Sequence, residues 1–206
     1  MADKNIRPQH ITNMDEVPLT FDITVNRTVE KMGTSTVSVW TTGHEKSCFT
    51  VVLACQADGQ KLPPMVIFKR KTLPKEKFPA GVIIKVNPKG WMDEDMMVAW
   101  LRETGRLLPL ICDSMRAHLT DAIKIQVKRM NTELTVILGG LTKELQLLDF
   151  GVNRSFKVKV RAAWACWMTD GEHTFTKTGK QRRSTYAMIC EWIADAWANV
   201  SVQTVV

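Results

Sequence analysis

Hydrophobic and polar residues alternate along residues 10–25. The alternating hydrophobic positions are Val17, Leu19, Phe21, Ile23 and Val25. A period of two predicts an extended strand. Residues 48–57 (CFTVVLACQA) are apolar at odd and even positions, which predicts a strand buried on both faces. Residues 61–69 (KLPPMVIFK) follow a turn signal and predict the return strand of a hairpin, at the sheet edge because its two prolines cannot donate ladder hydrogen bonds.

Beyond residue 90 the hydrophobic period becomes that of a helix. Met92, Met96 and Trp100 fall on one helical face within residues 90–106. The remaining segments are predicted strands at 107–112 and 135–138, helices at 118–130 and from 141 onward, a polar loop at 169–181, and a last amphipathic helix across 186–197. An antiparallel meander followed by helix–strand units predicts an α/β fold, with helices packed on a mixed sheet.

The composition narrows the class of protein. A chain of 206 residues with 45% hydrophobic and 24% charged residues is typical of one globular domain. We expect no membrane span, because no run approaches about 18–20 apolar residues. The start, MADKNIRPQH, lacks the apolar stretch of a secretory signal. The five cysteines are scattered, with no C-x-x-C pair, which predicts small core residues in a reducing compartment and argues against a zinc site.

Charge favours a polyanionic partner. The formal net charge is +7 and the isoelectric point is about 9.3, which points first to nucleic acid. The alternative is that these residues form ordinary solvated faces. The clustered basic residues that we predict to contact nucleic acid are Lys69, Arg70, Lys71, Arg154, Lys157, Lys180, Arg182 and Arg183.

Three aspartates occupy positions where a sheet collects its functional groups. Asp15 lies in the first extended segment, Asp113 follows the apolar run 107–112, and Asp149 starts a long helical segment. Open α/β sheets place active sites at the carboxyl ends of their strands. An aspartate after a strand is also a common helix cap. The pattern alone leaves competitors among the acidic residues, which are Glu16, Asp22, Asp93, Asp95 and Asp121.

A cluster of three carboxylates has a chemical use. Phosphodiester cleavage is commonly assisted by two metal ions about 3.5–4 Å apart. Mg²⁺ prefers hard oxygen ligands and keeps several waters, so a few carboxylates suffice to hold it. Without a cation, like charges in such a cluster would raise one another's pKa.

Three sequence blocks resemble the catalytic domain of pogo/Tigger-type transposases, in the mariner superfamily of DDE/DDD recombinases. The blocks are NMDE at residues 13–16, LICDSMRAH at 110–118, and GGLT at 139–142 followed by QLLD at 146–149. TTGHEK at residues 41–46 also resembles the family's wording. Their order and spacing make the similarity specific, and it covers roughly residues 10 to 200.

The resemblance implies a ribonuclease-H-like, mixed five-stranded sheet of order 3-2-1-4-5 flanked by helices. It implies that Asp15, Asp113 and Asp149 are catalytic ligands of two Mg²⁺ ions, which Mn²⁺ can replace. Glu16 is expected to face away from these metals, because neighbouring strand residues alternate. His44 and His118 are expected in structural or polar networks.

The implied activity is cleavage and strand transfer of DNA in the nucleus. We expect a tail at residues 1–9, the endonuclease domain at 10–168, and a basic loop and amphipathic helix of the same domain at 169–206. Leu138 and Leu147 stand where the family has proline, and no helix-turn-helix region lies upstream, so a truncated or degenerate copy is expected.

Two alternatives to an active nuclease stay open. The first is a catalytically inactive, domesticated or relic nucleic-acid-binding protein, which the basic clusters favour. The second is an interaction module whose Trp-rich C-terminal helices form a homodimer.

Overall fold

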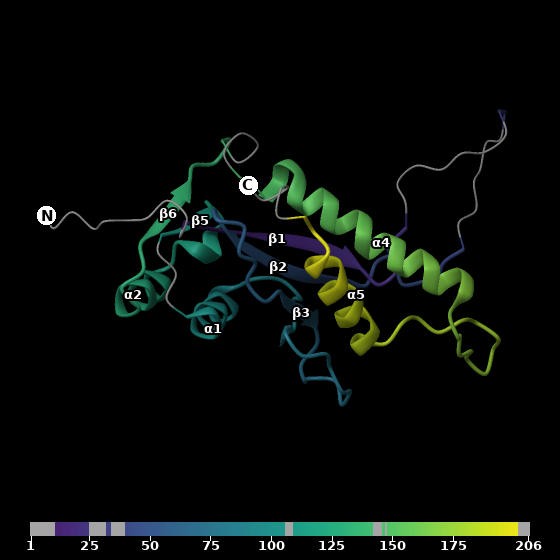
Figure 1. Ribbon diagram of the computed structural model, residues 1–206. Coiled ribbons are helices and arrows are strands. Elements are labelled where there is room, and N and C mark those ends of the chain that lie inside the picture. The colour runs from purple at the N-terminus through teal and green to yellow at the C-terminus, as the bar shows by residue number, and fades with distance from the viewer. Residues whose placement is uncertain are drawn as a thin grey trace, which may run out of the picture.

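A six-stranded mixed sheet forms the centre of the molecule (Figure 1). The computed structural model describes residues 11–24, 32–33, 40–105, 109–141, 146 and 148–201, except the side chains of residues 149 and 150. The strands are β1 (Thr12–Thr20), β2 (Cys48–Gln56), β3 (Met65–Lys69), β4 (Ile83–Asn87), β5 (Leu110–Asp113) and β6 (Leu134–Ile137). Their order is β4-β3-β2-β1-β5-β6. β1, β2 and β3 form the antiparallel meander, and β4, β5 and β6 pair in parallel with their neighbours.

The predicted fold class is confirmed, with one strand added. The five predicted strands lie in the predicted order, and β4 extends the sheet beyond β3. The prediction that the Pro63–Pro64 strand forms the sheet edge is therefore wrong. Both prolines precede β3, whose ladder begins at Met65, so their missing N–H groups cost no hydrogen bond with β4.

Four longer helices cover the sheet. They are α1 (Glu94–Thr104), α2 (Asp121–Arg129), α4 (Asn153–Asp170) and α5 (Tyr186–Ala198), with short helical turns η2 (Arg116–His118) and η3 (Leu148–Val152). The side chains of Asp93, Thr120 and Thr185 begin α1, α2 and α5 by accepting a hydrogen bond from a backbone N–H of the first turn. Polar residues thus set the helix starts, and apolar faces hold the helices on the sheet.

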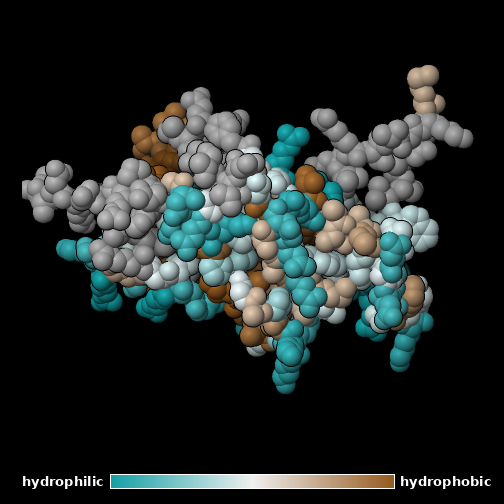
Figure 2. Space-filling view, viewed as in Figure 1, coloured by the Kyte–Doolittle hydropathy of each residue, from teal (hydrophilic) through white to brown (hydrophobic). Residues whose placement is uncertain are grey.

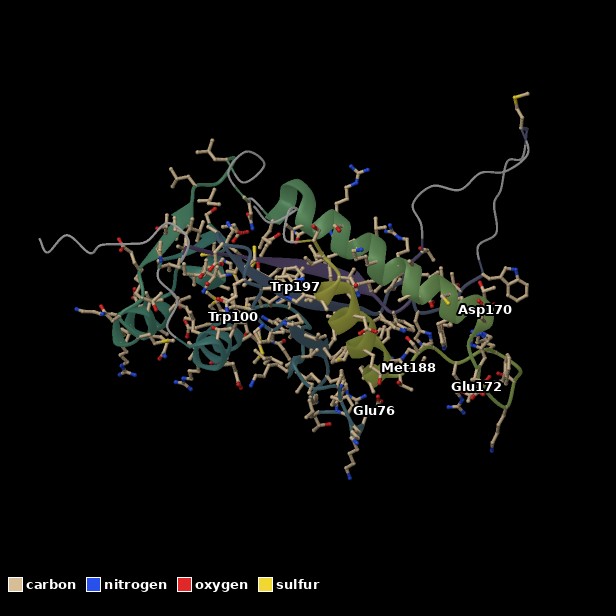
Figure 3. All side chains as sticks on the ribbon, in the orientation of Figure 1. Glu76, Trp100, Asp170, Glu172, Met188 and Trp197 are labelled. Carbon is tan, nitrogen blue, oxygen red and sulfur yellow. The ribbon has the colours of Figure 1, made fainter. Side chains whose placement is uncertain are left out.

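The sheet separates two hydrophobic cores. The first joins β1 and β2 to α4 and α5, and the second joins the opposite face of the sheet to α1 and α2. Figure 3 marks one residue of each core, Trp197 on α5 and Trp100 on α1. α4 turns an apolar face toward the first core, where Phe156, Val160 and Trp164 are all buried.

The surface is largely polar. None of the described helices is both long and apolar enough to cross a membrane. Figure 2 shows hydrophilic residues on the loop that projects below β3, where the basic positions Lys71, Lys75 and Lys77 are exposed. The predicted tail at residues 1–9 lies outside the described residues.

Candidate metal centre

The candidate site lies where β1 and β5 separate. The parallel pairing of these strands aligns Thr12 with Leu110 and Asn13 with Ile111, and stops there. Asp15 and Asp113 each lie two residues further along. Since side chains two residues apart share a face, the register gives both aspartates the same face of the sheet. Beyond this level β1 continues to pair with β2, and β5 continues to pair with β6.

Asp15 is held by the start of α4. Its side chain is 8% exposed, and its Oδ2 accepts a hydrogen bond of 2.6 Å from Nδ2 of Asn153, which is itself buried. A buried carboxylate needs such a donor, because unpaired burial of a charge is costly. The contact fixes the orientation of the Asp15 carboxylate and ties β1 to α4.

Asp113 is oriented from two sides. Its Oδ1 accepts a backbone hydrogen bond of 2.9 Å from Met115 and lies 2.9 Å from Nδ1 of His118. The hydrogen bond from His118 lowers the pKa of Asp113, and the Met115 N–H acts in the same direction against the effect of partial burial. The carboxylate is thus ionised at neutral pH, with one oxygen engaged and a side chain that is 28% exposed.

His118 joins Asp113 to Glu16. Its Nε2 lies 2.8 Å from Oε1 of Glu16, its ring is fully buried, and the Glu16 side chain is 12% exposed. Burial works against the imidazolium form, but hydrogen bonds with Asp113, Cys112 and Glu16 outweigh it and raise the pKa of His118 to about 12. We call Glu16, His118 and Asp113 the acid–histidine triad.

The acid–histidine triad resembles a metal cage in composition. One ligand atom from each of its residues lies within 4.8 Å of the others. Both nitrogens of its histidine are engaged, since Nδ1 lies 2.9 Å from Oδ1 of Asp113 and Nε2 lies 2.8 Å from Oε1 of Glu16. A metal ion bound here would have to replace these contacts, and with them in place His118 orients Asp113.

The donor set near Asp15 fits a hard cation. Carboxylate oxygens are the ligands that Mg²⁺ prefers, and Asp15 offers one such group. Among the described residues the close cluster of metal-ligating atoms holds Asp113 with Glu16 and His118 and does not include Asp15. Two residues before Asp15, on the same face of β1, the amide of Asn13 is buried, and within the described part of the chain neither its nitrogen nor its oxygen has a hydrogen-bond partner. Buried polar atoms are rarely left so, except where water or a ligand completes the site.

Asp149 lies in η3, the single turn that precedes α4 and contacts β1. It stands four residues before Asn153, the residue that binds Asp15. Residues four apart lie on one helical face, so the main chain of Asp149 is close to the site. Its side chain lies outside the described residues, and its role as third ligand stays a prediction.

Sequence reasoning missed two contacts. Glu16 lies on the opposite face of β1 from Asp15, as alternation requires, yet it meets Asp113 through His118, 102 positions away in sequence. The pairing of Asn153 with Asp15 spans 138 positions. Of these two contacts, only the one made by Asn153 had a signal in the sequence. Asn153 follows the predicted ligand Asp149 by about one helical turn, a spacing that indicates a place beside the site.

The predicted nucleic-acid-binding residues fall into separate groups. Lys69, Arg70 and Arg183 gather around the start of α5, where Arg70 donates a 3.0 Å hydrogen bond from Nη1 to the Tyr186 hydroxyl. Lys157 lines a neighbouring pocket on α4. The other predicted residues are exposed and stand apart from these pockets, namely Lys71, Arg154, Lys180 and Arg182.

The strand order and the helices on both faces of the sheet define a class, that of ribonuclease-H-like folds. Residues 46–206 match the family model described as "DDE superfamily endonuclease". The chain therefore belongs to the DDE superfamily endonuclease family.

The relatives agree with this assignment. "Pogo transposable element with KRAB domain", from Mus musculus and from Homo sapiens, is in each case 36% identical over 203 residues, which cover 94% of this chain. The same match covers 33% of those proteins, so this chain spans about one third of their length. The resemblance to pogo-type transposases is confirmed.

Solved structures show the same fold. "Mos1 transposase paired-end complex with left transposon end" superimposes with a TM-score of 0.60 at 12% identity, covering 96% of this chain and 50% of that one. "Structure of Mos1 transposase catalytic domain and Raltegravir with Mg" gives 0.54 at 11% identity, covering 96% and 75%. At this identity the likeness concerns the fold alone.

Proposed function

We propose that this chain is a DNA endonuclease domain whose phosphodiester cleavage and strand transfer depend on Mg²⁺. The observation that carries the proposal is the parallel pairing of β1 with β5, which ends two residues before Asp15 on one strand and two residues before Asp113 on the other. Membership of the endonuclease family and the basic surface support it. A substrate of this kind implies a nuclear location.

Asp15, Asp113 and Asp149 would hold the metal, with Asn153 and His118 as positioning residues for the first two. Bound Mg²⁺ supplies charge neutralisation for the phosphate and activation of the attacking oxygen, and Mn²⁺ serves the same purpose. We infer two ions from the family resemblance and the acid count.

The cleavage step is a displacement at phosphorus. A water oxygen forms a bond to phosphorus while the bond from phosphorus to a sugar oxygen breaks. The water gives up a proton to solvent and the sugar oxygen takes one, leaving a phosphate end and a hydroxyl end. In strand transfer, that hydroxyl takes the place of water and attacks a phosphodiester of a second DNA. The protein aligns these groups and keeps its carboxylates ionised for the metal.

Plasmid nicking tests the proposal. Supercoiled plasmid is incubated with the protein and Mg²⁺ or Mn²⁺, and conversion to open circle is followed on gels. We expect Asp113→Ala to lose the activity and chelation of the metal to abolish it. Asp121→Asn, an exposed aspartate at the start of α2, is the matched control and should nick like the unmodified protein. Equal nicking by Asp113→Ala would contradict the proposal.

A second candidate function is DNA binding without cleavage. The acid–histidine triad favours it, because His118 already neutralises charge on Asp113 without a metal. This candidate predicts DNA affinity that falls steeply with salt and is indifferent to Asp113→Ala, together with no nicking by the unmodified protein.

A further inference from the structure

A basic pocket lies at the end of β1 that is remote from the carboxylates. It has a volume of about 200 Å³ and receives the side chains of Lys46, Lys69 and Arg183, with Phe21 and Tyr186 as its aromatic walls. No carboxylate lines it. We call this site the arginine pocket. Three cations around a small cavity favour an anion, and a cavity below the roughly 300–1,000 Å³ of a drug-sized site suits one phosphate group rather than a nucleotide.

Arg183 is presented by stacking rather than by ion pairing. Its guanidinium carbon lies 3.9 Å from the centre of the Phe21 ring and 4.4 Å from that of Tyr186. Within the described residues no carboxylate forms an ion pair with Arg183, Lys46 or Lys69. Its Nη1 donates a 3.1 Å hydrogen bond to the Ser184 carbonyl. Stacking on aromatic faces leaves the remaining N–H groups of the guanidinium to donate to a phosphate.

The pocket is built before any ligand arrives. Asp22, which is 1% exposed, accepts hydrogen bonds from Thr42 (N, 3.1 Å; Oγ1, 2.8 Å) and from the His44 N–H at 2.7 Å. These contacts fix the turn that carries Lys46 against the end of β1. Preorganisation of this kind lowers the entropic cost of binding.

The backbone that carries Lys69 into the pocket is also fixed. Lys69 ends β3 in register with Asn87 of β4, so its backbone belongs to the sheet. Figure 3 shows Glu76 near Met188 at the start of α5. Glu76 accepts a 2.7 Å hydrogen bond from the Ala187 N–H, and its carboxylate therefore engages this helix end, leaving recognition of an added anion to the pocket's side chains.

The positive surface continues beyond one phosphate. A second pocket shares Cys48 with the arginine pocket and is lined by Lys157 and Arg161, one turn apart on α4, again without a carboxylate. The Nε of Arg161 is buried with no hydrogen-bond partner in the described residues. A pair of adjacent cationic pockets suits successive phosphates of one strand better than a single small anion.

We propose that the arginine pocket binds a backbone phosphate of duplex DNA at a distance from the cleavage site. The proposal rests on the DNA substrate of the proposed function. From Asp15 to the end of β1 at Thr20 the strand rises about 17 Å. The pocket would therefore engage a different phosphate from the one that is cleaved.

DNA binding without metal tests the pocket independently of catalysis. Fluorescence anisotropy with a labelled duplex in the presence of chelator gives affinity as a function of salt. Arg183→Gln should weaken binding about tenfold, as expected for loss of hydrogen bonds from a charged group, and reduce the salt slope by about 0.9, the value for one phosphate contact. Lys46→Gln, on an exposed turn, should reduce the slope similarly without disturbing the aromatic stack.

Arg102→Gln is the matched control, because Arg102 is exposed on α1, on the opposite face of the sheet. It should bind DNA like the unmodified protein, and circular dichroism should show all variants folded. Unchanged slopes for both Arg183→Gln and Lys46→Gln would overturn the proposal, as would inorganic phosphate binding to the pocket with no DNA affinity.

The two proposals fail separately. If the protein binds DNA through Arg183 but never nicks plasmid, the proposed nuclease activity is refuted and the proposed role of the arginine pocket stands. A protein that nicks plasmid while Arg183→Gln leaves the salt slope unchanged refutes the pocket alone.

Discussion

Replacement of His118 by alanine should cost the protein a large part of its stability. The ring is fully buried between Glu16 and Asp113, whose side chains are 12% and 28% exposed. Without His118, the Glu16 carboxylate stays buried with no cation beside it. Breaking a buried ion pair by removing one partner costs about 3–5 kcal/mol. We take the lower end, about 3 kcal/mol, because Asp113 is partly solvated, and this loss is a large share of the roughly 5–15 kcal/mol that stabilises a domain.

Urea denaturation followed by tryptophan fluorescence measures this loss. Glu16→Gln keeps the shape of the side chain and an acceptor for His118, so it should cost less than His118→Ala. In the double variant the effects should not add, with a coupling energy of about 1–3 kcal/mol between the two sites.

The control is His173→Ala, because His173 lies in the partly exposed loop after α4 and bonds only its local neighbours. It should change stability by less than about 1 kcal/mol. A loss below about 0.5 kcal/mol for His118→Ala, or strict additivity with Glu16→Gln, would refute the reasoning that His118 neutralises the two carboxylates.

Three further predictions concern other contacts. Asn153→Ala removes a donor to Asp15 and should lower the nicking rate about 10–100-fold in plasmid assays, the range for partners of metal ligands. It should also lower the melting temperature, because the buried carboxylate loses a hydrogen bond. Lys61→Met removes three hydrogen bonds from the partly exposed Nζ, two to the last carbonyls of α5 (Trp197 and Ala198) and one to the Val200 carbonyl just beyond it. It should cost about 1 kcal/mol in urea unfolding, with Lys61→Arg losing less. Burial raises the pKa of Cys55 to about 11 and of Cys190 to about 12, so only the two exposed cysteines should react quickly with a thiol reagent at neutral pH, and all five after unfolding.

The strands and helices that face the two cores could be predicted because their apolar spacing is strict. β2 is buried on both faces, and its sequence is apolar at both odd and even positions. β4 was not predicted, although residues 82–86 (VIIKV) are rich in the β-branched residues typical of strands. Its place in the sheet depends on pairing with β3, which is a tertiary contact. Local pattern cannot reveal such a contact.

The candidate site was also predictable only in part, because some of its contacts depend on tertiary structure. Asp15, Asp113 and Asp149 were predicted as ligands from sequence motifs, and the pairing of β1 with β5 ends two residues before the first two of them. The hydrogen bond between Glu16 and His118 depends on where the η2 turn places His118 relative to β1, and the local sequence does not specify this placement. The stack of Arg183 on Phe21 likewise joins a loop to a strand end far away in sequence.

A crystal soaked in Mn²⁺ tests the central claim most directly. Anomalous scattering locates the ion without reference to activity. The account predicts an anomalous peak between β1 and β5 that is bound by carboxylate oxygens of Asp15 and Asp113. A peak ligated by Glu16 and His118 instead, or no peak beside Asp113 at a concentration that supports nicking, would contradict it.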